Sequence, residues 1–345
     1  MPPSLNKKEN EILAANTPEA LFSGDLSLAK KEYRDYAKSW HPDHNTSLSA
    51  PVVFDHITNL FNQAKDKLEK NTVWDQNNVL TITDNNKKNY KIKYLRKHTF
   101  ELGEMYLANT LVLYIIKDDI LFKNAMKTIQ SFHYHDDNMK AEMQKYLPNI
   151  KCSFSLDNKQ SCLIVNKTED LLLLKDVVNT FTLTPEHIAW ILNRLYNIIC
   201  WLNYEMKLTH GGINLDNLFI SPPYHSVALL GGYWYATPFG TKLSALPLLN
   251  YQYLPPEIKD KKLADPRIDL DSLRLLGRTL LKDSAGSKLI KNPTVPKPIG
   301  EFLCGASNAD ALHEYKTWTD KVLFDSFGKR KFVELNLTAN DIYKE

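Results

Sequence analysis

The spacing of apolar residues divides the chain into a helical first part, a strand-rich middle part and a long helical remainder. Five residues of the segment 28–40 (LAKKEYRDYAKSW) fall on one helical face: Ala29, Tyr33, Tyr36, Ala37 and Trp40. From 90 to 117, aromatic and β-branched residues form short runs typical of strands, among them TLVLYIIK. After Thr184, which can cap a helix that starts at Pro185, apolar residues recur every three or four positions. This order predicts an α+β fold class.

The length favours two domains, because 345 residues exceed one average domain. Residues 1–15 are polar, and we expect them to be a flexible N-terminus. Residues 16–72 are expected to form a small all-α domain. The segment 73–89 has five asparagines around a short apolar VLTIT, and we interpret it as a linker that can pass through a strand. Residues 90–345 are expected to form the second domain.

Composition and charge exclude several classes of protein. Hydrophobic residues make up 43% and charged residues 24%, which is ordinary for a globular chain. The net charge of +3 is too small to indicate nucleic-acid binding. The four cysteines form no C-x-x-C pair, which favours reduced thiols over disulfides or zinc: Cys152, Cys162, Cys200 and Cys304. There is no secretory signal pattern and no membrane-length apolar run, so we expect a cytoplasmic protein with no membrane partner.

A helical hairpin is predicted around residues 28–68. Pro42 ends the first helix, because proline lacks an N–H and disfavours helical geometry in the residue before it. A second apolar helix follows from about 52 to 68, so His41 and Asp43 lie at the tip. Three basic residues are spaced by four on another face of the first helix: Lys30, Arg34 and Lys38.

These residues resemble the J domain of DnaJ-family co-chaperones. The signature positions here are Tyr33-Arg34, Ala37 and His41-Pro42-Asp43, followed by Phe54 and Ile57 of an F-x-x-I pattern. The resemblance covers about residues 16–70. The family's first helix is poorly represented, by TPEALF at 17–22, and the Gly/Phe-rich linker and zinc-binding cysteines are absent. The alternative is a hairpin whose turn merely uses Pro and Asp, beside a solvated basic face.

The resemblance implies a partner, which is a DnaK-type (heat-shock-70) chaperone. In J domains the His-Pro-Asp loop and basic helix dock on the ATP-bound chaperone and trigger ATP hydrolysis there. By this resemblance, Asp43 is the charge partner of a chaperone arginine, and His41-Pro42 gives the loop its shape. Lys30, Arg34 and Lys38 then attract an acidic surface, an effect that salt should weaken.

The remainder, 90–345, resembles the protein-kinase-like fold, with an N-lobe at 90–167 and a C-lobe at 168–345. ELGEMYLAN places Gly103 at the third glycine of G-x-G-x-x-G, while His98 and Phe100 replace the first two. LVLYIIK places Lys117 at the ion-pairing lysine. Three acids after it are candidates for its partner, and the sequence leaves the choice open: Asp136, Asp137 and Glu142. CLIVNKTEDL (162–171) matches the strand and hinge between the lobes.

The reactive positions of this resemblance are occupied by glycine. THGGINLDNLFI matches H-R-D-x-x-x-x-N, with His210 and Asn217 kept and Gly212 at the catalytic base. In VALLGGY, Gly231 replaces the metal-holding aspartate. By the same resemblance, Asp269 braces the catalytic loop, and Pro256-Glu257 ends the activation segment.

Phosphoryl transfer needs a carboxylate near the attacking hydroxyl and another that holds magnesium. We therefore expect no enzyme, no catalytic residue, no metal and no cofactor. Binding of ATP without catalysis is compatible with Lys117, although a lysine at a strand end is commonly solvated. His133 and His135, with Asp136 and Asp137 beside them, could suggest a metal site, but neighbouring polar residues are more often a loop.

The sequence therefore predicts a co-chaperone that stimulates the chaperone ATPase and targets it through a kinase-like binding domain. An unidentified protein client is expected to bind that domain. Two alternatives stay open. One is an atypical kinase that uses another carboxylate, such as Asp216 or Asp170, and the other is a decoy that sequesters the chaperone.

Overall fold

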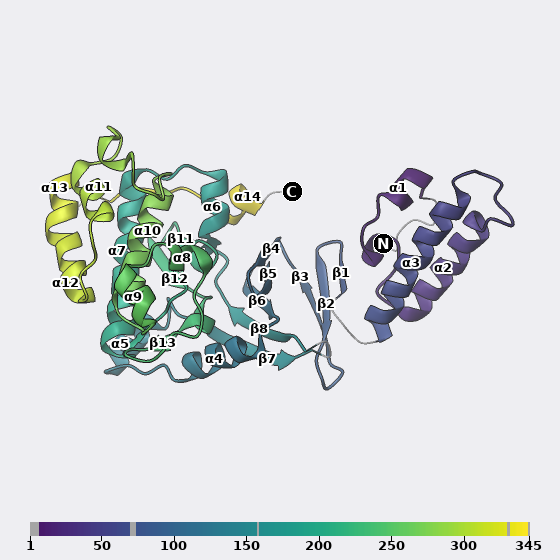
Figure 1. The fold of residues 1–345 in the computed structure, drawn as a ribbon, viewed down its shortest axis with the longest axis horizontal. Helices are drawn as coiled ribbons and strands as arrows, with labels where there is room; N and C mark the ends of the chain where they lie inside the picture. Colours follow the sequence, from purple (N-terminus) through teal and green to yellow (C-terminus); the bar gives the residue numbers. More distant parts are fainter. Residues whose placement is uncertain (1–6, 70–73, 157–158, 330–331, 344–345) are drawn as a thin grey trace.

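The computed structural model describes residues 7–69, 74–156, 159–329 and 332–343. Three helices lie at one side of the molecule, a small three-stranded sheet lies beside them, and a larger sheet and a helical lobe follow (Figure 1). Strand-rich and helical lobes follow one another along the chain, in agreement with the expected α+β class.

The N-terminal unit consists of α1 (Glu9–Leu13), a 3-10 turn (Pro18–Ala20), α2 (Leu26–Trp40) and α3 (Ala50–Glu69). The carboxylate of Asp25 caps α2 by accepting hydrogen bonds from the N–H groups of Ser27 and Leu28, both at 2.9 Å. The helices enclose one apolar cluster, whose buried members are Ile12, Ala15, Leu21, Phe22, Ala29, Tyr36, Val53, Ile57, Leu60, Ala64 and Trp74.

The expectation that residues 1–15 are flexible is wrong for the part that is described. Ile12 and Ala15 are buried in the cluster of the N-terminal unit, and the His56 ring lies 2.9 Å from the Ala15 carbonyl. These two apolar side chains hold the short helix α1 in place because they pack in the same cluster as residues of α3. Residues 1–6 lie outside the described residues.

The segment interpreted as a linker is folded. Strands β1 (Trp74–Gln76), β2 (Val79–Thr83) and β3 (Asn89–Lys93) form an antiparallel sheet in the order β1-β2-β3. Asn77 and Asn78 have φ angles of 54° and 57° and make the two-residue turn between β1 and β2. Asparagine tolerates this left-handed backbone, so the asparagines that suggested a linker are turn residues of a sheet.

Strand β1 joins the two parts of the molecule. Trp74 is 4% exposed and packs in the cluster of the N-terminal unit, and Gln76 Nε2 donates to the carbonyls of Glu19 (3.1 Å) and Phe22 (3.3 Å). Asp75 accepts a hydrogen bond from Tyr94 Oη at 2.7 Å. Successive side chains of a strand point to opposite faces. One strand therefore contacts both parts, and the N-terminal unit is docked on the sheet.

The larger sheet has five antiparallel strands in the order β4-β5-β6-β8-β7. They are β4 (Arg96–Phe100), β5 (Gly103–Leu107), β6 (Leu111–Ile116), β7 (Asn149–Ser155) and β8 (Ser161–Asn166), with α4 (Asp119–Gln130) and α5 (Asp137–Met143) between β6 and β7. One face packs on β1–β3 through residues such as Leu80, Ile82 and Leu113. The other face, with Val112 and Ile116, belongs to the core that continues into the helical lobe.

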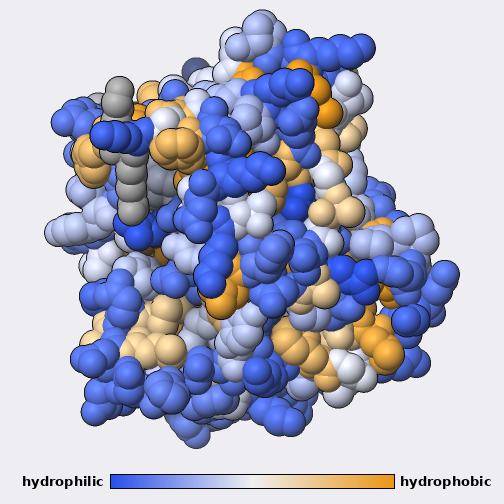
Figure 2. Space-filling view, turned by 90° about the vertical axis from the view of Figure 1, so that its left-hand side faces the viewer, coloured by the Kyte–Doolittle hydropathy of each residue, from blue (hydrophilic) through white to orange (hydrophobic). Residues whose placement is uncertain are grey.

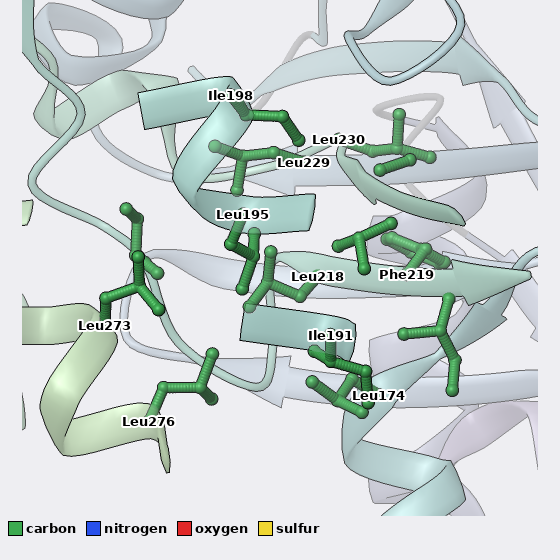
Figure 3. Packing of buried hydrophobic residues seen from close by; sticks show 14 of the residues in the cluster. Leu174, Ile191, Leu195, Ile198, Leu218, Phe219, Leu229, Leu230, Leu273 and Leu276 are labelled. Carbon is green, nitrogen blue, oxygen red and sulfur yellow. The ribbon is translucent and has the colours of Figure 1, made fainter. Parts of the chain in front are cut away.

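The helical lobe is built around α7 (Pro185–Tyr204), which starts after Thr184 as the sequence predicts. Ile191, Leu195 and Ile198 of α7 pack on residues of β11 (Leu218–Ser221) and β12 (Ser226–Leu229), as Figure 3 shows. Up to residue 280, the helical lobe also contains β9 (Leu172–Leu173), α6 (Leu174–Thr180), β10 (Leu208–Thr209), η2 (Tyr233–Tyr235), β13 (Thr237–Pro238), α8 (Leu248–Gln252), α9 (Pro256–Lys261) and α10 (Arg267–Leu280). Its last elements are η3 (Leu289–Lys291), α11 (Lys297–Cys304), α12 (Ala311–Lys316), η4 (Thr317–Val322), α13 (Leu323–Phe327) and α14 (Ala339–Tyr343).

The face of the helical lobe shown in Figure 2 is mostly hydrophilic, with small separate apolar patches. Within the described residues, no helix combines the length and apolarity needed to cross a bilayer.

The contacts of β1 generate a test. Trp74→Ala removes the apolar side chain that joins β1 to the N-terminal unit, and a buried Trp→Ala change costs about 3–5 kcal/mol. We expect α2 and α3 to tumble faster than the rest of the chain in this variant, measured by 15N relaxation of their amides. In the wild type, all parts should share one correlation time. Leu48→Ala, at a fully exposed loop position, is the control and should change nothing. Separate correlation times in the wild type would contradict a docked unit, and a single correlation time in Trp74→Ala would show that Trp74 is not the joining contact.

Candidate functional site

The candidate site lies where the two lobes meet. It is formed by the loop 210–217, between β10 and β11, and by residues 231–235, which follow β12. Tyr114 of β6 approaches from the sheet, and α10 lies beneath the loop. Side chains from widely separated parts of the chain thus meet around the two glycines Gly212 and Gly231.

Asp269, in the first turn of α10, fixes the beginning of the loop. Its side chain is fully buried, and its two carboxylate oxygens accept hydrogen bonds from the N–H groups of His210 (2.7 Å) and Gly211 (2.8 Å). Burial raises the pKa of Asp269 to about 6, an effect that the two N–H groups oppose. At neutral pH the group is therefore mainly a carboxylate, which is the form that accepts both hydrogen bonds.

His210 ties the loop to the segment after β12. Its Nε2 lies 3.0 Å from the carbonyl oxygen of Gly231, and its Nδ1 accepts a hydrogen bond from the N–H of Gly212 at 3.1 Å. Burial lowers the pKa of His210 to about 3, so the imidazole is neutral at physiological pH. The proton then sits on Nε2, because Nδ1 is already an acceptor and a carbonyl can only accept.

Neither glycine has room for a side chain. Asn217 Nδ2 donates to the Gly212 carbonyl at 2.7 Å. A Cβ on Gly231 would lie 2.6 Å from Asn217 Oδ1 and 2.7 Å from Tyr114 Oη. A Cβ on Gly212 would lie 2.9 Å from the Tyr235 ring and 3.0 Å from the Gly232 carbonyl. The Gly231 distances are below 3.0 Å, and a Cβ on Gly212 would crowd a backbone carbonyl, so a side chain at either position requires its neighbours to shift.

Aromatic side chains fill the space between the lobes beside these glycines. Trp234 stacks on Phe100, with ring centroids 5.4 Å apart, and meets the Tyr114 ring edge-to-face at 5.3 Å. Burial raises the pKa of the Tyr114 phenol, so the group stays neutral. Sequence reasoning missed Tyr114 and Trp234. A signal was present for Tyr114, because strand alternation places it on the same face as Val112 and Ile116.

Lys117 does not occupy an ion-pairing position. It follows the last residue of β6, its side chain is exposed, and within the described residues no ion pair to it is found. The three acids left open as its partner belong to the start or body of α5: the Asp136 carboxylate caps that helix, Asp137 is in its first turn, and Glu142 pairs with Lys145 at 2.8 Å. The helix that directly follows β6 is α4.

Helix α4 contacts the site through a neutral side chain. Asn124 Nδ2 donates to the carbonyls of Trp234 (3.0 Å) and Ala236 (2.9 Å). An amide therefore lies where α4 approaches the segment after β12. Its short polar side chain in the sequence NAMK gave no signal for this contact before the tertiary structure was known.

The hairpin of β4 and β5 is too short to form an open loop over the site. Phe100 pairs directly with Gly103, so only Glu101 and Leu102 make the turn. A Cβ on Gly103 would lie 1.9 Å from the Ile115 carbonyl, which explains this glycine by close packing. Glu101 accepts hydrogen bonds from Tyr235 Oη (3.0 Å) and from the N–H of Leu248 (3.2 Å). The hairpin tip is thereby attached to the helical lobe.

His98 of β4 adds a second connection between the lobes. Its Nε2 lies 3.0 Å from Asp176 Oδ2 of α6, and both side chains are largely buried. Sequence reasoning treated His98 only as a replaced glycine. Its large side chain instead reaches the opposite lobe.

The carboxylate of Asp216, considered above as a substitute catalytic group, pairs with Lys175 at 2.6 Å. His133 lies near backbone carbonyls of Glu205 and Ser131. Across the described ranges, no group of three or more His, Cys, Asp or Glu side chains is arranged to hold a metal ion.

The six residues expected to contact a chaperone lie at the exposed end of the N-terminal unit. Lys30, Arg34 and Lys38 are exposed along α2, and His41 ends that helix. Pro42 and Asp43 are exposed, and the Asp43 N–H donates to His41 Nδ1 at 3.2 Å. The His41 ring meets the Phe54 ring edge-to-face at 4.9 Å, which attaches the loop to α3.

Comparison with known proteins finds similar solved structures but no similar sequence. No family model and no curated protein matches this sequence. A solved structure described as the structure of vaccinia related kinase 3 is similar, with a TM-score of 0.47 and 14% sequence identity. The match covers 70% of this chain and 90% of that one. The neighbour is a protein kinase by its description.

Proposed function

We propose that this protein is a co-chaperone, in which an N-terminal J domain stimulates the ATPase of a DnaK-type chaperone. The observation that carries the proposal is the exposed His41-Pro42-Asp43 loop at the end of α2, beside the basic residues of the same helix. The contact of the His41 ring with the Phe54 ring attaches the loop to α3. Its geometry is therefore maintained while Asp43 stays accessible to a partner.

The charges of α2 support an acidic docking partner. Lys30, Arg34 and Lys38 are spaced by one helical turn and face solvent. Among the described residues, Lys38 forms an ion pair with Asp35 at 3.8 Å, and none is found for Lys30 or Arg34. Exposed charges of this kind accelerate association more than they strengthen the final complex, and salt screens them.

We further propose that the rest of the chain is a protein-kinase-like domain without transferase activity. The support is chemical, because Gly212 and Gly231 offer no carboxylate for a proton or a magnesium ion. It is also steric, because Tyr114 and Trp234 fill the adjacent space. The alternative of an atypical kinase that uses Asp216 is disfavoured by the ion pair of that residue with Lys175.

In this proposal, the kinase-like domain binds a protein client and the J domain directs the chaperone to it. The contacts of Trp74 and Gln76 favour a fixed orientation between the two domains. A client bound to the kinase-like domain would then lie at a set distance from the His-Pro-Asp loop, in place of the variable distance that a flexible linker allows.

The co-chaperone proposal is tested on the chaperone ATPase. The full-length chain should stimulate single-turnover ATP hydrolysis by a DnaK-type chaperone, and Asp43→Asn should abolish the stimulation because it removes the exposed charge. Asp55→Asn, an exposed aspartate on α3, is the matched control and should stimulate like the wild type. Raising the salt from 50 to 300 mM, chosen to shorten the Debye length to below ~10 Å, should reduce the wild-type effect. Equal stimulation by wild type and Asp43→Asn, with unchanged helicity, would rule out the J-domain assignment.

The proposed lack of transferase activity is tested at the glycines of the site. Radiolabelled ATP with magnesium or manganese should give no transfer to protein substrates. Gly231→Asp should not create activity and should lower the free energy of unfolding by about 1–3 kcal/mol or more, because its Cβ overlaps Asn217 and Tyr114. Urea denaturation measures the change.

ATP binding gives an independent check of the filled cleft. Millimolar Mg-ATP should leave the melting temperature of the wild type unchanged, since a ligand stabilises a protein only if it binds the native state. A clear upward shift would contradict the filled cleft, and transfer that Gly231→Asp strengthens would contradict the inactive assignment.

A further inference from the structure

Strand β3 is an outer strand of the small sheet, and its free edge is open to solvent. Within the described residues, β3 pairs with β2 alone. The inward-facing Leu80 and Ile82 of β2 are 0% exposed. Their direct neighbours on β3, Ile92 and Tyr90, face the same way and are only half-buried. Burial is thus complete in the middle of this sheet and incomplete at β3, as expected at an uncovered edge.

Three residues of β3 direct unused backbone hydrogen-bonding groups along this edge. Hydrogen-bonded pairs alternate with non-bonded pairs in an antiparallel ladder. The Tyr94 N–H donates to the Asn78 carbonyl at 2.9 Å, which identifies the even-numbered residues of β3 as the set that is bonded to β2. The backbone groups that point away from β2 are those of Asn89, Lys91 and Lys93. Among the described residues, no hydrogen bond to these backbone groups is found.

The same edge carries positive charge that nearby carboxylates do not pair with. Four exposed lysines lie on β3 and in the turn before it: Lys87, Lys88, Lys91 and Lys93. In the described ranges, no ion pair to any of them is found. The turn contains one acid, Asp84, which is buried and accepts hydrogen bonds from two N–H groups of the turn and from the Tyr90 hydroxyl.

These lysines restrict which strand can pair with the edge. Two copies of a basic edge repel each other, which is how outer strands commonly avoid self-association. A strand of opposite charge is attracted, because opposite charges placed across a strand pair are favourable and like charges are unfavourable. On the inner face, the half-buried Tyr90, Ile92 and Leu111 offer apolar surface to every second residue of an added strand.

We propose that β3 binds an acidic, extended segment of a partner protein, which adds to the small sheet as a further strand. Its carboxylates lie beside Lys91 and Lys93, and the residues between them are apolar and cover Tyr90 and Ile92. Main-chain hydrogen bonds give such a complex its affinity, and the alternate side chains give it specificity. The inference goes beyond the proposed function, because it requires neither the His-Pro-Asp loop nor the glycines of the site.

The experiment uses the full-length chain and fluorescent peptides of about six residues, the usual length of a strand. Fluorescence anisotropy measures the binding. A peptide of alternating glutamate and valine should bind about tenfold or more tightly than one of alternating lysine and valine, because only the first has charges opposite to those of β3. It should also bind more tightly than a peptide of the same composition with consecutive glutamates, in which the acids no longer share one face.

Matched charge reversals locate the peptide. The double variant Lys91→Glu/Lys93→Glu should weaken binding of the alternating glutamate–valine peptide about tenfold or more, because attraction becomes repulsion at two positions. The control is Lys316→Glu/Lys321→Glu, at exposed lysines of α12 and η4, which changes the net charge equally and should bind like the wild type. All four positions are exposed, so both variants should fold, which circular dichroism checks.

Backbone methylation of the peptide tests the added strand itself. In such a strand, every second N–H points at β3 and the others point at solvent. N-methylation of one alternate set of residues should therefore abolish binding, while methylation of the other set should leave it unchanged.

Several outcomes would overturn the proposal. No binding of the glutamate–valine peptide, or full binding by Lys91→Glu/Lys93→Glu, would remove β3 as the binding surface. Equal effects of the two methylated sets would exclude strand addition. A single-stranded oligonucleotide that binds more tightly than the peptide, and loses binding in the same double variant, would assign the lysines to a nucleic-acid backbone and exclude an acidic protein segment.

Discussion

The buried carboxylate of Asp269 is the interaction on which the candidate site depends. A charge inside an apolar core is tolerated only when hydrogen bonds replace its water, and here two consecutive backbone N–H groups do so. The loop that starts at His210 is consequently fixed at its first two residues. From that point, the neutral His210 imidazole fixes the Gly231 carbonyl, and Asn217 closes the loop on Gly212. Removal of the carboxylate would leave the N–H groups of a buried loop without partners.

The polar framework holds the two segments so close together that a side chain at 212 or 231 requires its buried neighbours to shift. Glycine at these positions therefore fits the packing of this chain, and it also removes the two carboxylates that phosphoryl transfer needs. Tyr114, from the opposite lobe, approaches the Gly231 position, and Trp234 then stacks on Phe100. Tyr114 and Trp234 belong to the same apolar cluster as the helical lobe, so the two lobes share one core at this point.

The same principle, apolar packing with a few directional hydrogen bonds, attaches the N-terminal unit. Trp74 supplies the apolar contact, and Gln76 gives the contact a direction by donating to two carbonyls. A strand of three residues is enough to connect the two parts of the molecule, because its alternate side chains contact the N-terminal unit on one face and the rest of the chain on the other. The proposed chaperone-binding loop and the strand-rich part of the chain thus belong to one connected structure.

The sequence by itself determined the local structure and its order. The helical hairpin, the strand-rich lobe and the long helix after Thr184 follow from hydrophobic periodicity, proline placement and capping, all of which act over a few residues. The residues His210, Asn217 and Asp269 could be named from a family resemblance, since their spacing is a local pattern. The short helix at Glu9–Leu13 was not predicted, and the segment 73–89 was expected to be a linker with at most a strand in it. Short apolar runs among polar residues fold only when a distant surface covers them, so the sequence alone did not indicate a sheet there.

Only the tertiary structure decided which side chains meet. Lys117 lies outside the site because it follows the last residue of β6. A shift of one position along a strand decides whether a side chain faces the core or the solvent. The contacts of Asn124, Tyr114 and Trp234 join segments separated by more than a hundred residues, and no pattern along the chain encodes such distances.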